Sequence, residues 1–277
     1  MAIINIYHQK NFVILTTIYH SIYYRYTHIY NNCNISLSSH FKKRTKEEKK
    51  KFIMASKDKI VIYGHQASRA SRPYWLLREY GMKIGEDFLE VDTGGPVTGF
   101  NDVRDTEEFL KLNPYRLIPV MKHGDVVLYE SQAICQYIAN VLGGPMSAQN
   151  EGERARISMY GLSSISNFEP NLLPMVFGQG GKEGRVQFTK KLQPLLNALN
   201  TELEGRDYLI GEGRGRFTVA DVMMASVVGQ YGRAIKFDYS PWPNVLTWVN
   251  LTTKRPAFYP PRGMKVNPKG EAPKGKL

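Results

Sequence analysis

Residues 113–137 read NPYRLIPVMKHGDVVLYESQAICQY and join two short apolar runs to a helical pattern. The runs, residues 118–121 and 126–129, are connected by a polar segment that contains Gly, which predicts a β-hairpin. Pro119 has no backbone N–H, so it suits the start of a strand and would break the ladder in the middle of one. A helical pattern begins at Ser131, directly after the second run. The stretch therefore predicts a hairpin that leads into a helix.

The residues before this stretch predict the rest of an α/β domain. A β-branched run reads as a buried strand, and Ser71 can cap the helix that follows it, which Gly81 ends. With the hairpin and its helix, the order β-α-β-α-β-β-α is that of a thioredoxin-like domain. The predicted elements are a strand at 59–63, a helix at 69–80, a strand at 87–91, a loop at 92–105 and a short helix at 107–112.

The residues after the hairpin and its helix predict an all-helical domain. Gly143-Gly144-Pro145 breaks the pattern, so residues 143–150 are expected to be a linker. Thr218 and Asp221 stand at the spacing of a capping box, with Asp in place of the usual Glu. Residues from 264 onward are rich in Lys, Gly and Pro and are expected to be disordered. The predicted helices are 153–177, 185–204, 222–228 and 242–251, with prolines interrupting the first two.

The domain boundaries follow from these patterns and from charge. The formal charge is +12, and residues 1–53 alone hold nine Lys and Arg against two acids. The remaining residues are close to balanced, so the charge gives little support for a nucleic-acid-binding surface. We expect an extension at 1–53, a thioredoxin-like domain at 54–142 and a helical domain at 151–277.

Residues 1–53 do not have the composition of a folded domain. They are rich in Ile, Tyr, Asn and His, and the first forty contain no acid. One interpretation is translated upstream sequence with the true start at Met54. An organelle-targeting leader and a basic interaction tail are the alternatives, and none of the three predicts packed structure.

Cysteine content and hydropathy exclude several classes of protein. The two cysteines, Cys33 and Cys135, offer neither a disulfide framework nor metal-ligand spacing, so we expect a reducing compartment and no metal site. No run of about eighteen apolar residues is present, so no membrane-spanning helix is expected. His65 and His123 are interpreted as loop residues, and Cys135 as a buried small hydrophobe.

Four motifs in the same order resemble the cytosolic glutathione S-transferases, most closely their phi class. YGHQAS at 63–68 is similar to the phi-class first loop, and NPYRLIP at 113–119 to the family's loop before its cis-proline. YESQAI at 129–134 resembles the Glu-Ser signature, and FTVAD at 217–221 a cap in the helical domain. The resemblance covers residues 58–259.

This resemblance implies a fold and an activity. The expected fold is that of the glutathione S-transferases, with an α/β thioredoxin-like N-terminal domain and an all-α C-terminal domain. The expected activity is a detoxification reaction in which the glutathione thiolate attacks a small hydrophobic electrophile. Glutathione is then a co-substrate and no cofactor is implied. A homodimer in the cytoplasm is expected, without a nucleic-acid or membrane partner.

The resemblance also implies four glutathione-binding residues. Ile118 would offer its backbone N–H and C=O to the cysteinyl unit, with Pro119 in the cis form. Ser131, at a helix N-terminus, would bind the γ-glutamyl carboxylate, and Glu130 the γ-glutamyl amine. The structural alternatives are a trans proline at a strand start and an ordinary helix cap.

Ser68 is the expected catalytic residue. A thiol reacts as its thiolate, and a hydroxyl that donates to the sulfur stabilises this anion. A turn serine is the structural alternative, and Ser71 is a second candidate for the same role. No cysteine lies in this loop, which argues against the thiol-exchange members of the superfamily.

Two departures from the phi-class pattern affect the glycine end of glutathione. The loop at 92–105 has no His-Lys pair, for which Arg104 or Lys111 could substitute, and Leu117 replaces a usual glutamine. Binding without catalysis is therefore the alternative function from another class. A glutathione-dependent peroxidase is a third hypothesis. The second-substrate pocket is expected near the first long helix, where core packing is the alternative for each of Tyr160, Asn167 and Phe168.

Overall fold

The structure is a computed structural model that describes residues 59–95 and 99–258. The predictions for residues 1–53 and for the tail from 264 onward lie outside the described residues. In chain order the elements are β1 (Ile60–Tyr63), α3 (Ser71–Glu79), β2 (Phe88–Val91), β3 (Gly94–Gly95), β4 (Gly99–Phe100), the 3-10 helix η1 (Asp102–Asp105), α4 (Glu107–Leu112), β5 (Val120–His123), β6 (Val126–Tyr129), α5 (Ser131–Leu142), the 3-10 helix η2 (Gly144–Met146), α6 (Glu151–Ser163), the π-helical segment η3 (Ser164–Phe168), α7 (Glu169–Val176), α8 (Gly181–Glu202), α9 (Val219–Ala225), α10 (Val228–Ala234) and α11 (Pro243–Thr253).

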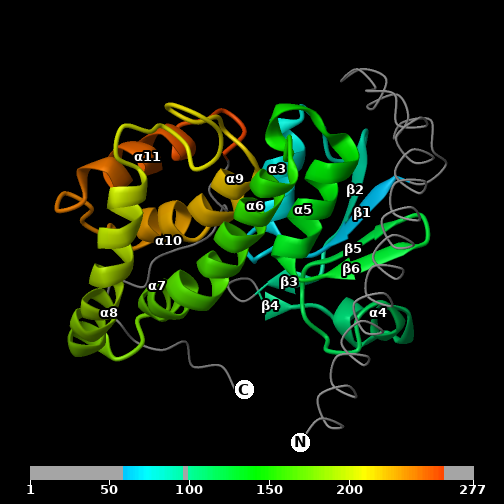
Figure 1. Ribbon diagram of the computed structural model, residues 1–277. Helices are drawn as coiled ribbons and strands as arrows, with labels where there is room; N and C mark the ends of the chain where they lie inside the picture. Colours follow the sequence, from blue (N-terminus) through cyan, green and yellow to red (C-terminus); the bar gives the residue numbers. More distant parts are fainter. Residues whose placement is uncertain (1–58, 96–98, 259–277) are drawn as a thin grey trace, which may run out of the picture. The chain divides into compact units, whose positions relative to one another are not determined.

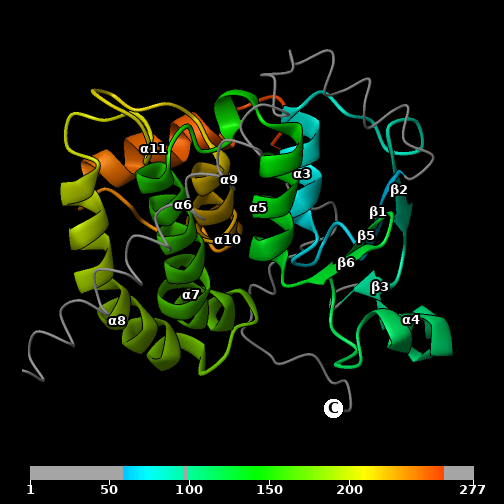
Figure 2. The ribbon, with the colours of Figure 1, turned by 45° about the vertical axis from the view of Figure 1, so that its right-hand side comes forward.

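A four-stranded mixed sheet with the order β2-β1-β5-β6 forms the base of the N-terminal part. β1 pairs with β2 in parallel and with β5 antiparallel, and β5 and β6 form the predicted hairpin. Helices α3 and α5 stand side by side against the sheet (Figures 1 and 2). α4 lies apart from them, and its Phe109 ring meets Tyr63 edge-on at 6.0 Å. The predicted β-α-β-α-β-β-α order is confirmed.

Two details of the N-terminal part differ from the prediction. The segment 92–105 was expected to be a loop, but it contains the β3–β4 pair and η1. Ser71 was expected to cap α3, but the N-cap is Ala70 and makes no side-chain hydrogen bond. The Ser71 hydroxyl instead lies 3.4 Å from Gln230, because nearly the whole first half of α3 is buried.

The helical part begins with one nearly continuous helix, since α6, η3 and α7 follow each other directly. The prolines were expected to interrupt the long helices, and this is wrong. Pro170 lies directly after the π-helical segment η3, in the first turn of α7, whereas Pro174 and Pro194 lie inside α7 and α8. The apolar run predicted as one helix at 222–228 is divided between α9 and α10.

One hydrophobic cluster extends through both parts of the chain. It includes Ile62 and Trp75 from the N-terminal part and Trp248 from α11. Trp75 packs against Phe217 and Phe258 with ring centroids 6.2 and 4.9 Å apart. The division into domains at 54–142 and 151–277 therefore stays a prediction.

The predicted capping box at the start of α9 is confirmed. Thr218 accepts from the backbone N–H of Ala220, and the Asp221 carboxylate accepts from the N–H of Thr218 at 2.9 Å. Asp221 also accepts from Leu209 N and from Trp248 Nε1, each at 3.0 Å. This fully buried carboxylate thus joins α9, α11 and the loop before α9.

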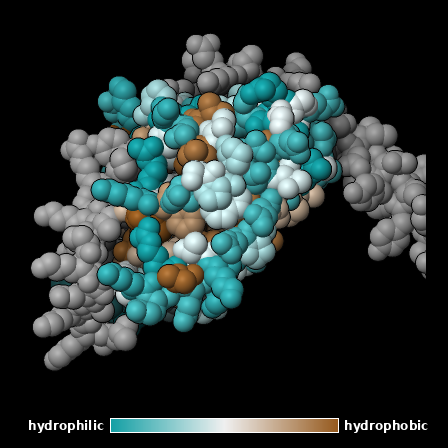
Figure 3. Space-filling model, turned by 90° about the vertical axis from the view of Figure 1, so that its left-hand side faces the viewer, coloured by the Kyte–Doolittle hydropathy of each residue, from teal (hydrophilic) through white to brown (hydrophobic). Residues whose placement is uncertain are grey.

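The surface on the α8 side carries mainly hydrophilic side chains, with a few hydrophobic ones among them (Figure 3). Such scattered apolar side chains are normal on a globular protein. Within the described ranges, no helix combines the length and the apolarity that a membrane crossing requires.

Candidate functional site

The loop before β5 presents free backbone groups beside the sheet. Asn113 is buried, and its side chain donates to Leu117 O at 2.9 Å and accepts from Tyr115 N at 3.1 Å. The peptide bond between Ile118 and Pro119 is cis, as predicted. Among the described residues, the N–H and C=O of Ile118 have no hydrogen-bond partner. The side chain of Asn113 thus shapes a loop whose last residues can pair with an extended ligand.

The N-terminus of α5 follows the hairpin directly. Glu130 is its N-cap, with φ +70° and no side-chain hydrogen bond, and its side chain is exposed. Ser131 is the first helical residue and is 3% exposed. The first N–H groups of a helix have no carbonyl partner within it and attract anions. The Glu130 carboxylate therefore favours a cation, and the helix N-terminus at Ser131 beside it favours an anion.

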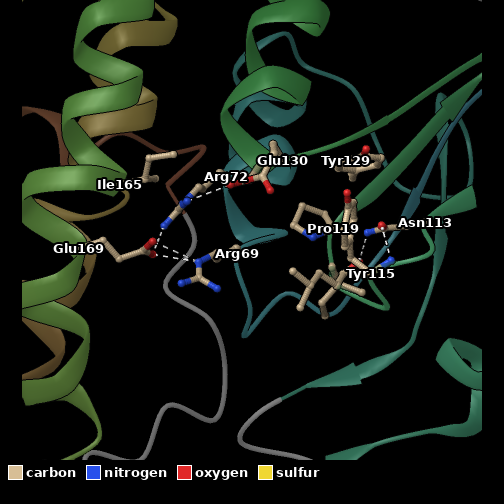
Figure 4. A pocket seen from close by; sticks show the side chains of 12 residues that line it. Arg69, Arg72, Asn113, Tyr115, Pro119, Tyr129, Glu130, Ile165 and Glu169 are labelled. Carbon is tan, nitrogen blue, oxygen red and sulfur yellow. Dashed lines mark hydrogen bonds and ion pairs between the residues drawn. The ribbon is translucent and has the colours of Figure 1, made fainter.

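A pocket of about 310 Å³ brings together all four residues predicted to bind glutathione. Ile118 and Pro119 precede β5, and Glu130 and Ser131 lie at the start of α5. Figure 4 shows Pro119 and Glu130 among the side chains that line the pocket. The role of these four residues as ligands stays a prediction. The remaining lining residues are Arg69, Arg72, Asn113, Tyr115, Leu117, Tyr129, Ile165 and Glu169. We call this cavity the polar pocket.

Arg72 is the centre of a buried network that the sequence did not predict. The residue is 1% exposed, and its Nη1 donates to Ser131 Oγ at 2.8 Å. Its Nη2 donates to the carboxylate of Glu169 and lies 3.4 Å from the Tyr231 hydroxyl. Tyr231 donates to Glu169 at 3.0 Å. Arg69 Nε donates to both Glu169 oxygens at 3.1 and 3.2 Å (Figure 4). One carboxylate thus serves two guanidinium groups, which leaves an excess of positive charge beside Ser131.

The ionisation states in this network follow from burial and charge. Burial disfavours the Glu169 anion, but Arg72 and Arg69 outweigh this effect and lower the pKa of its carboxyl. Burial also opposes the charge of Arg72, whereas Tyr231 and Glu169 raise the pKa of its guanidinium. Burial raises the pKa of the Tyr231 hydroxyl, which therefore stays a hydrogen-bond donor. Arg72 and Glu169 are both charged at neutral pH.

A second pocket of about 200 Å³ adjoins the first, and the two share Arg69, Leu117 and Ile118. Its walls are mostly apolar, and Ser68 is one of its lining residues. We call it the apolar pocket. Its other lining residues are Ala67, Phe100, Arg104, Leu173, Phe177 and Tyr231.

The hydroxyl of Ser68 takes part in the turn before α3. It donates to His65 O at 2.6 Å and accepts from Ala70 N at 3.1 Å. A hydroxyl hydrogen can rotate toward another acceptor, so this geometry is compatible with a bond to a ligand's sulfur. Ser71 lines neither pocket, and its hydroxyl faces Gln230. Of the two candidate serines, Ser68 is the one beside the site, and its catalytic role stays a prediction.

The remaining candidates from the sequence lie in other places. Tyr160 donates to Glu202 at 3.0 Å, Asn167 donates to Ser163 at 3.1 Å, and Phe168 is buried in the core. None of the three lines the polar or the apolar pocket, where Ile165, Glu169, Leu173 and Phe177 stand instead. The residues of this helical segment that reach the pockets therefore lie later in the chain than the three expected ones.

Of the two cations that could substitute for the missing His-Lys pair, Arg104 and Lys111, only Arg104 lies at one of these pockets. Arg104 lines the apolar pocket, and its Nε donates to Arg116 O at 2.8 Å. Lys111 lines neither of the two pockets. Arg69, which the sequence did not single out, is the cation that both pockets share.

His65, His123 and Cys135 line neither the polar nor the apolar pocket. His65 Nδ1 accepts from Ala67 N at 3.1 Å, and His123 Nδ1 lies 3.0 Å from the Tyr137 hydroxyl. Cys135 is fully buried and unpaired, as expected. Residues 59–95 and 99–258 contain no group of three His, Cys, Asp or Glu side chains that could hold a metal ion.

Comparisons with known proteins agree with this geometry. The family model described as the glutathione S-transferase N-terminal domain matches residues 68–141. Glutathione S-transferase D7 of Drosophila melanogaster is 28% identical over 202 residues, covering 70% of this chain and 84% of the relative. A glutathione S-transferase of Hyoscyamus muticus is 28% identical over 165 residues, covering 55% of this chain and 76% of the relative.

A solved structure gives the same fold. The theta-class glutathione S-transferase of Xanthomonas axonopodis pv. citri, determined with glutathione bound, superimposes with a TM-score of 0.58 at 25% identity, over 75% of this chain and 98% of that one. The fold is that of the glutathione S-transferases, with a thioredoxin-like N-terminal part and a helical C-terminal part. Together the matches support the glutathione S-transferase family, and they do not single out the phi class.

Proposed function

We propose that this chain is a glutathione transferase that conjugates the glutathione thiolate to hydrophobic electrophiles. The observation that carries the proposal is the polar pocket, which brings Ile118, Pro119, Glu130 and Ser131 together although the sequence separates them into two motifs. An apolar pocket directly beside it, with Ser68 in its wall, supports the presence of a second substrate. Relatives named glutathione S-transferase support the same reaction class.

The γ-glutamyl and cysteinyl parts of glutathione each have a chemical counterpart in the polar pocket. The γ-glutamyl carboxylate would accept hydrogen bonds from the first N–H groups of α5 and from the Ser131 hydroxyl, with Arg72 behind it. The γ-glutamyl amine would pair with the exposed carboxylate of Glu130. The cysteinyl unit would pair with the free backbone groups of Ile118. This arrangement directs the sulfur toward the boundary with the apolar pocket.

Ser68 would stabilise the reacting sulfur. Its hydroxyl hydrogen would turn from His65 O to the thiolate, while its oxygen would keep the bond from Ala70 N. A hydrogen bond to the charged form of a group lowers its pKa, so more thiolate is present at neutral pH. The sulfur then attacks the electrophilic carbon, a C–S bond forms, and the leaving group departs with its electron pair.

The proposal includes four finer statements. The YGHQAS loop supports a position closest to the phi class. A homodimer is proposed, and sedimentation of the full chain would test it. A location in the cytoplasm is supported by an unpaired Cys135, since thiols stay reduced there. Conjugation is proposed over peroxide reduction, and assays with an aryl halide and an organic hydroperoxide would separate the two.

The test uses the full chain, titrated with glutathione while the ultraviolet absorbance of the thiolate is followed. A thiolate signal in the wild type that Ser68→Ala removes, with glutathione still bound, supports the proposal. Ser71→Ala is the matched control, because its hydroxyl faces Gln230 and lines neither pocket. Absence of glutathione binding by calorimetry would refute the proposal. Glutathione binding without a thiolate signal would favour the alternative of a non-catalytic binding protein. The missing His-Lys pair and Leu117 are the features that support this alternative.

A further inference from the structure

The walls of the apolar pocket are mostly apolar, but they also carry positive charge. Six apolar residues line it, and its two charged lining residues are both arginines, Arg69 and Arg104. Neither Asp nor Glu is among its lining residues. Low-polarity walls strengthen the field of such charges, since few solvent dipoles screen them. The apolar lining residues are Ala67, Phe100, Leu117, Ile118, Leu173 and Phe177.

Arg104 is held in a fixed position without neutralising its charge. Its guanidinium lies over the Phe100 ring at 4.0 Å from the centroid. Its Nε and Nη2 both donate to the backbone oxygen of Arg116, a neutral acceptor. The nearby Asp105 forms its ion pair with Arg116, at 3.0 Å. Among the described residues, Arg104 therefore has no carboxylate partner.

Arg69 is only partly neutralised. Its Nε donates to Glu169, but its two Nη groups make no hydrogen bond with the described residues, and its side chain is 48% exposed. Glu169 must also balance the fully buried Arg72, which is the closer of its partners. Arg69 thus offers free N–H donors and residual positive charge at the boundary of the two pockets.

We propose that the apolar pocket selects compounds that carry an anionic group, such as an aromatic carboxylate or sulfonate, which Arg69 and Arg104 bind while the apolar walls hold the ring. This deepens the proposed function and rests on it, because it names the class of the second substrate. A neutral apolar ligand would leave Arg104 without a counter-charge, and would leave Arg69 with only the carboxylate that it shares with Arg72. A carboxylate or a sulfonate instead presents two oxygens to two N–H donors of a guanidinium.

The reactive form of such a substrate is an aryl halide with a carboxylate, for example a chloronitrobenzoate. The thiolate sulfur would form the C–S bond, the C–Cl bond would break, and chloride would leave with its electron pair. The thiol proton is released to solvent. The matched neutral substrate is the corresponding chloronitrobenzamide, which has the same ring and leaving group.

The first experiment measures binding without glutathione, so that it does not depend on the proposed function. The full chain is titrated with a fluorescent anionic probe, anilinonaphthalene sulfonate, and with the neutral phenylnaphthylamine. We expect tighter binding of the sulfonate, and a loss of about fivefold in this preference for each of Arg69→Gln and Arg104→Gln. Gln keeps an N–H donor for Glu169 or for Arg116 O while it removes the charge. Arg154→Gln, at an exposed arginine that lines neither pocket, should keep the preference.

The second experiment compares turnover of the chloronitrobenzoate and the chloronitrobenzamide in the same variants. The ratio of their kcat/KM values should fall about fivefold with each arginine removed. An unchanged probe preference in both variants would overturn the inference while leaving the transferase proposal intact. A higher Kd for glutathione with an unchanged preference would assign these arginines to the glycine carboxylate of glutathione, and would also overturn it. Failure of glutathione binding with a normal probe preference would instead count against the proposed function alone.

Discussion

Arg72 Nη1 and Ser131 Oγ lie 2.8 Å apart, although 59 residues separate them in the sequence. A hydroxyl oxygen that accepts from a guanidinium keeps its own hydrogen free to donate. The Ser131 hydrogen can therefore point at an acceptor in the polar pocket, and the positive charge behind it favours an anionic one. Because Arg72 also binds Glu169 on α7, the site at the start of α5 depends on the helical part of the chain.

Arg72→Met should lower both stability and glutathione affinity, whereas a double variant should recover only the stability. Arg72→Met removes the buried cation from Glu169, whose carboxylate keeps only the half-exposed Arg69 as a charged partner, and the loss costs up to about 3 kcal/mol. Adding Glu169→Gln removes the buried carboxylate, and water can solvate the 48% exposed Arg69, so part of the lost free energy of unfolding should be recovered. The affinity should stay low in both variants because Ser131 has lost its guanidinium. Urea unfolding and calorimetric titration with glutathione measure the two quantities.

The control for this cycle is a second ion pair that connects α3 with the C-terminal part of the chain. Arg255 Nε donates to Glu79 at 2.8 Å, and both residues lie outside the polar pocket. Arg255→Met should lower stability without changing the Kd for glutathione. If Arg72→Met behaved in the same way, Arg72 would have a structural role only.

Glu130→Gly should keep or improve stability while it weakens glutathione binding. Glu130 has φ +70°, a conformation that costs a residue with a side chain about 1 kcal/mol and that glycine adopts freely. We expect Glu130→Gly to be more stable than Glu130→Ala by this amount. Both variants lose the carboxylate for the γ-glutamyl amine, so the Kd for glutathione should rise at least tenfold. Thermal unfolding and calorimetry give both values.

Lys236 provides the comparison for the backbone effect, because it has φ +50° and lies after α10. Lys236→Gly should likewise favour the fold but leave the glutathione Kd unchanged. A Kd for glutathione in Glu130→Gly equal to that of the wild type would mean that the Glu130 carboxylate has no part in binding.

The site could be predicted from the sequence only where its residues are close neighbours in the chain. Ile118 with Pro119 and Glu130 with Ser131 each belong to one short motif, and the hairpin that joins the motifs is indicated by two apolar runs around a polar segment that contains Gly. The cis form of Pro119 was expected from the family resemblance and not from the residues alone. The order of the strands and helices followed from the same local signals.

The network around Arg72 could not be predicted because its bonds connect residues about one hundred positions apart. The available signal was the place of Arg72 on a helix whose neighbours Trp75 and Leu76 are apolar, which indicates a buried charge in need of a partner. Nothing in the sequence identified Glu169 as that partner. Ser71 was expected to cap its helix because cap preferences are local, whereas packing against Gln230 decided its place.

Stability should depend on pH through Asp221. Burial raises the pKa of this carboxyl to about 6, although Trp248, Leu209 and Thr218 donate hydrogen bonds that lower it. A raised pKa in the folded state contributes stability that is present at low pH and is lost as the pH rises from about 4 through 6. The wild type should therefore lose about 3 kcal/mol relative to Asp221→Asn over this range. Urea unfolding of both proteins between pH 4 and pH 7 measures the difference.

Asp238→Asn serves as the control, because Asp238 should contribute to stability with the opposite pH dependence. The backbone and side chain of Ser240 lower the pKa of Asp238, so its contribution is present at higher pH and is lost on acidification. Parallel pH profiles for the wild type and Asp221→Asn would show that Asp221 keeps an ordinary pKa.

Cys135 should be inert in the folded protein and should report on glutathione binding. Burial raises the pKa of its thiol to about 12, despite the charge of Arg72 nearby, and the side chain is fully buried. The cysteine thiolate is the nucleophile that attacks a thiol reagent, so Cys135 should react only when α5 opens. In a Cys33→Ser variant, Ellman's reagent should give no rapid reaction under native conditions and one equivalent in urea.

Because Cys135 lies one turn from Ser131, a ligand that holds the start of α5 should slow this opening. S-methylglutathione, which has no free thiol, at one hundred times its Kd should reduce the labelling rate about a hundredfold. The same ligand should have less effect in Arg72→Met, in proportion to its weaker affinity. Rapid native labelling would contradict the burial of Cys135, and labelling that ignores S-methylglutathione would contradict its binding at the N-terminus of α5.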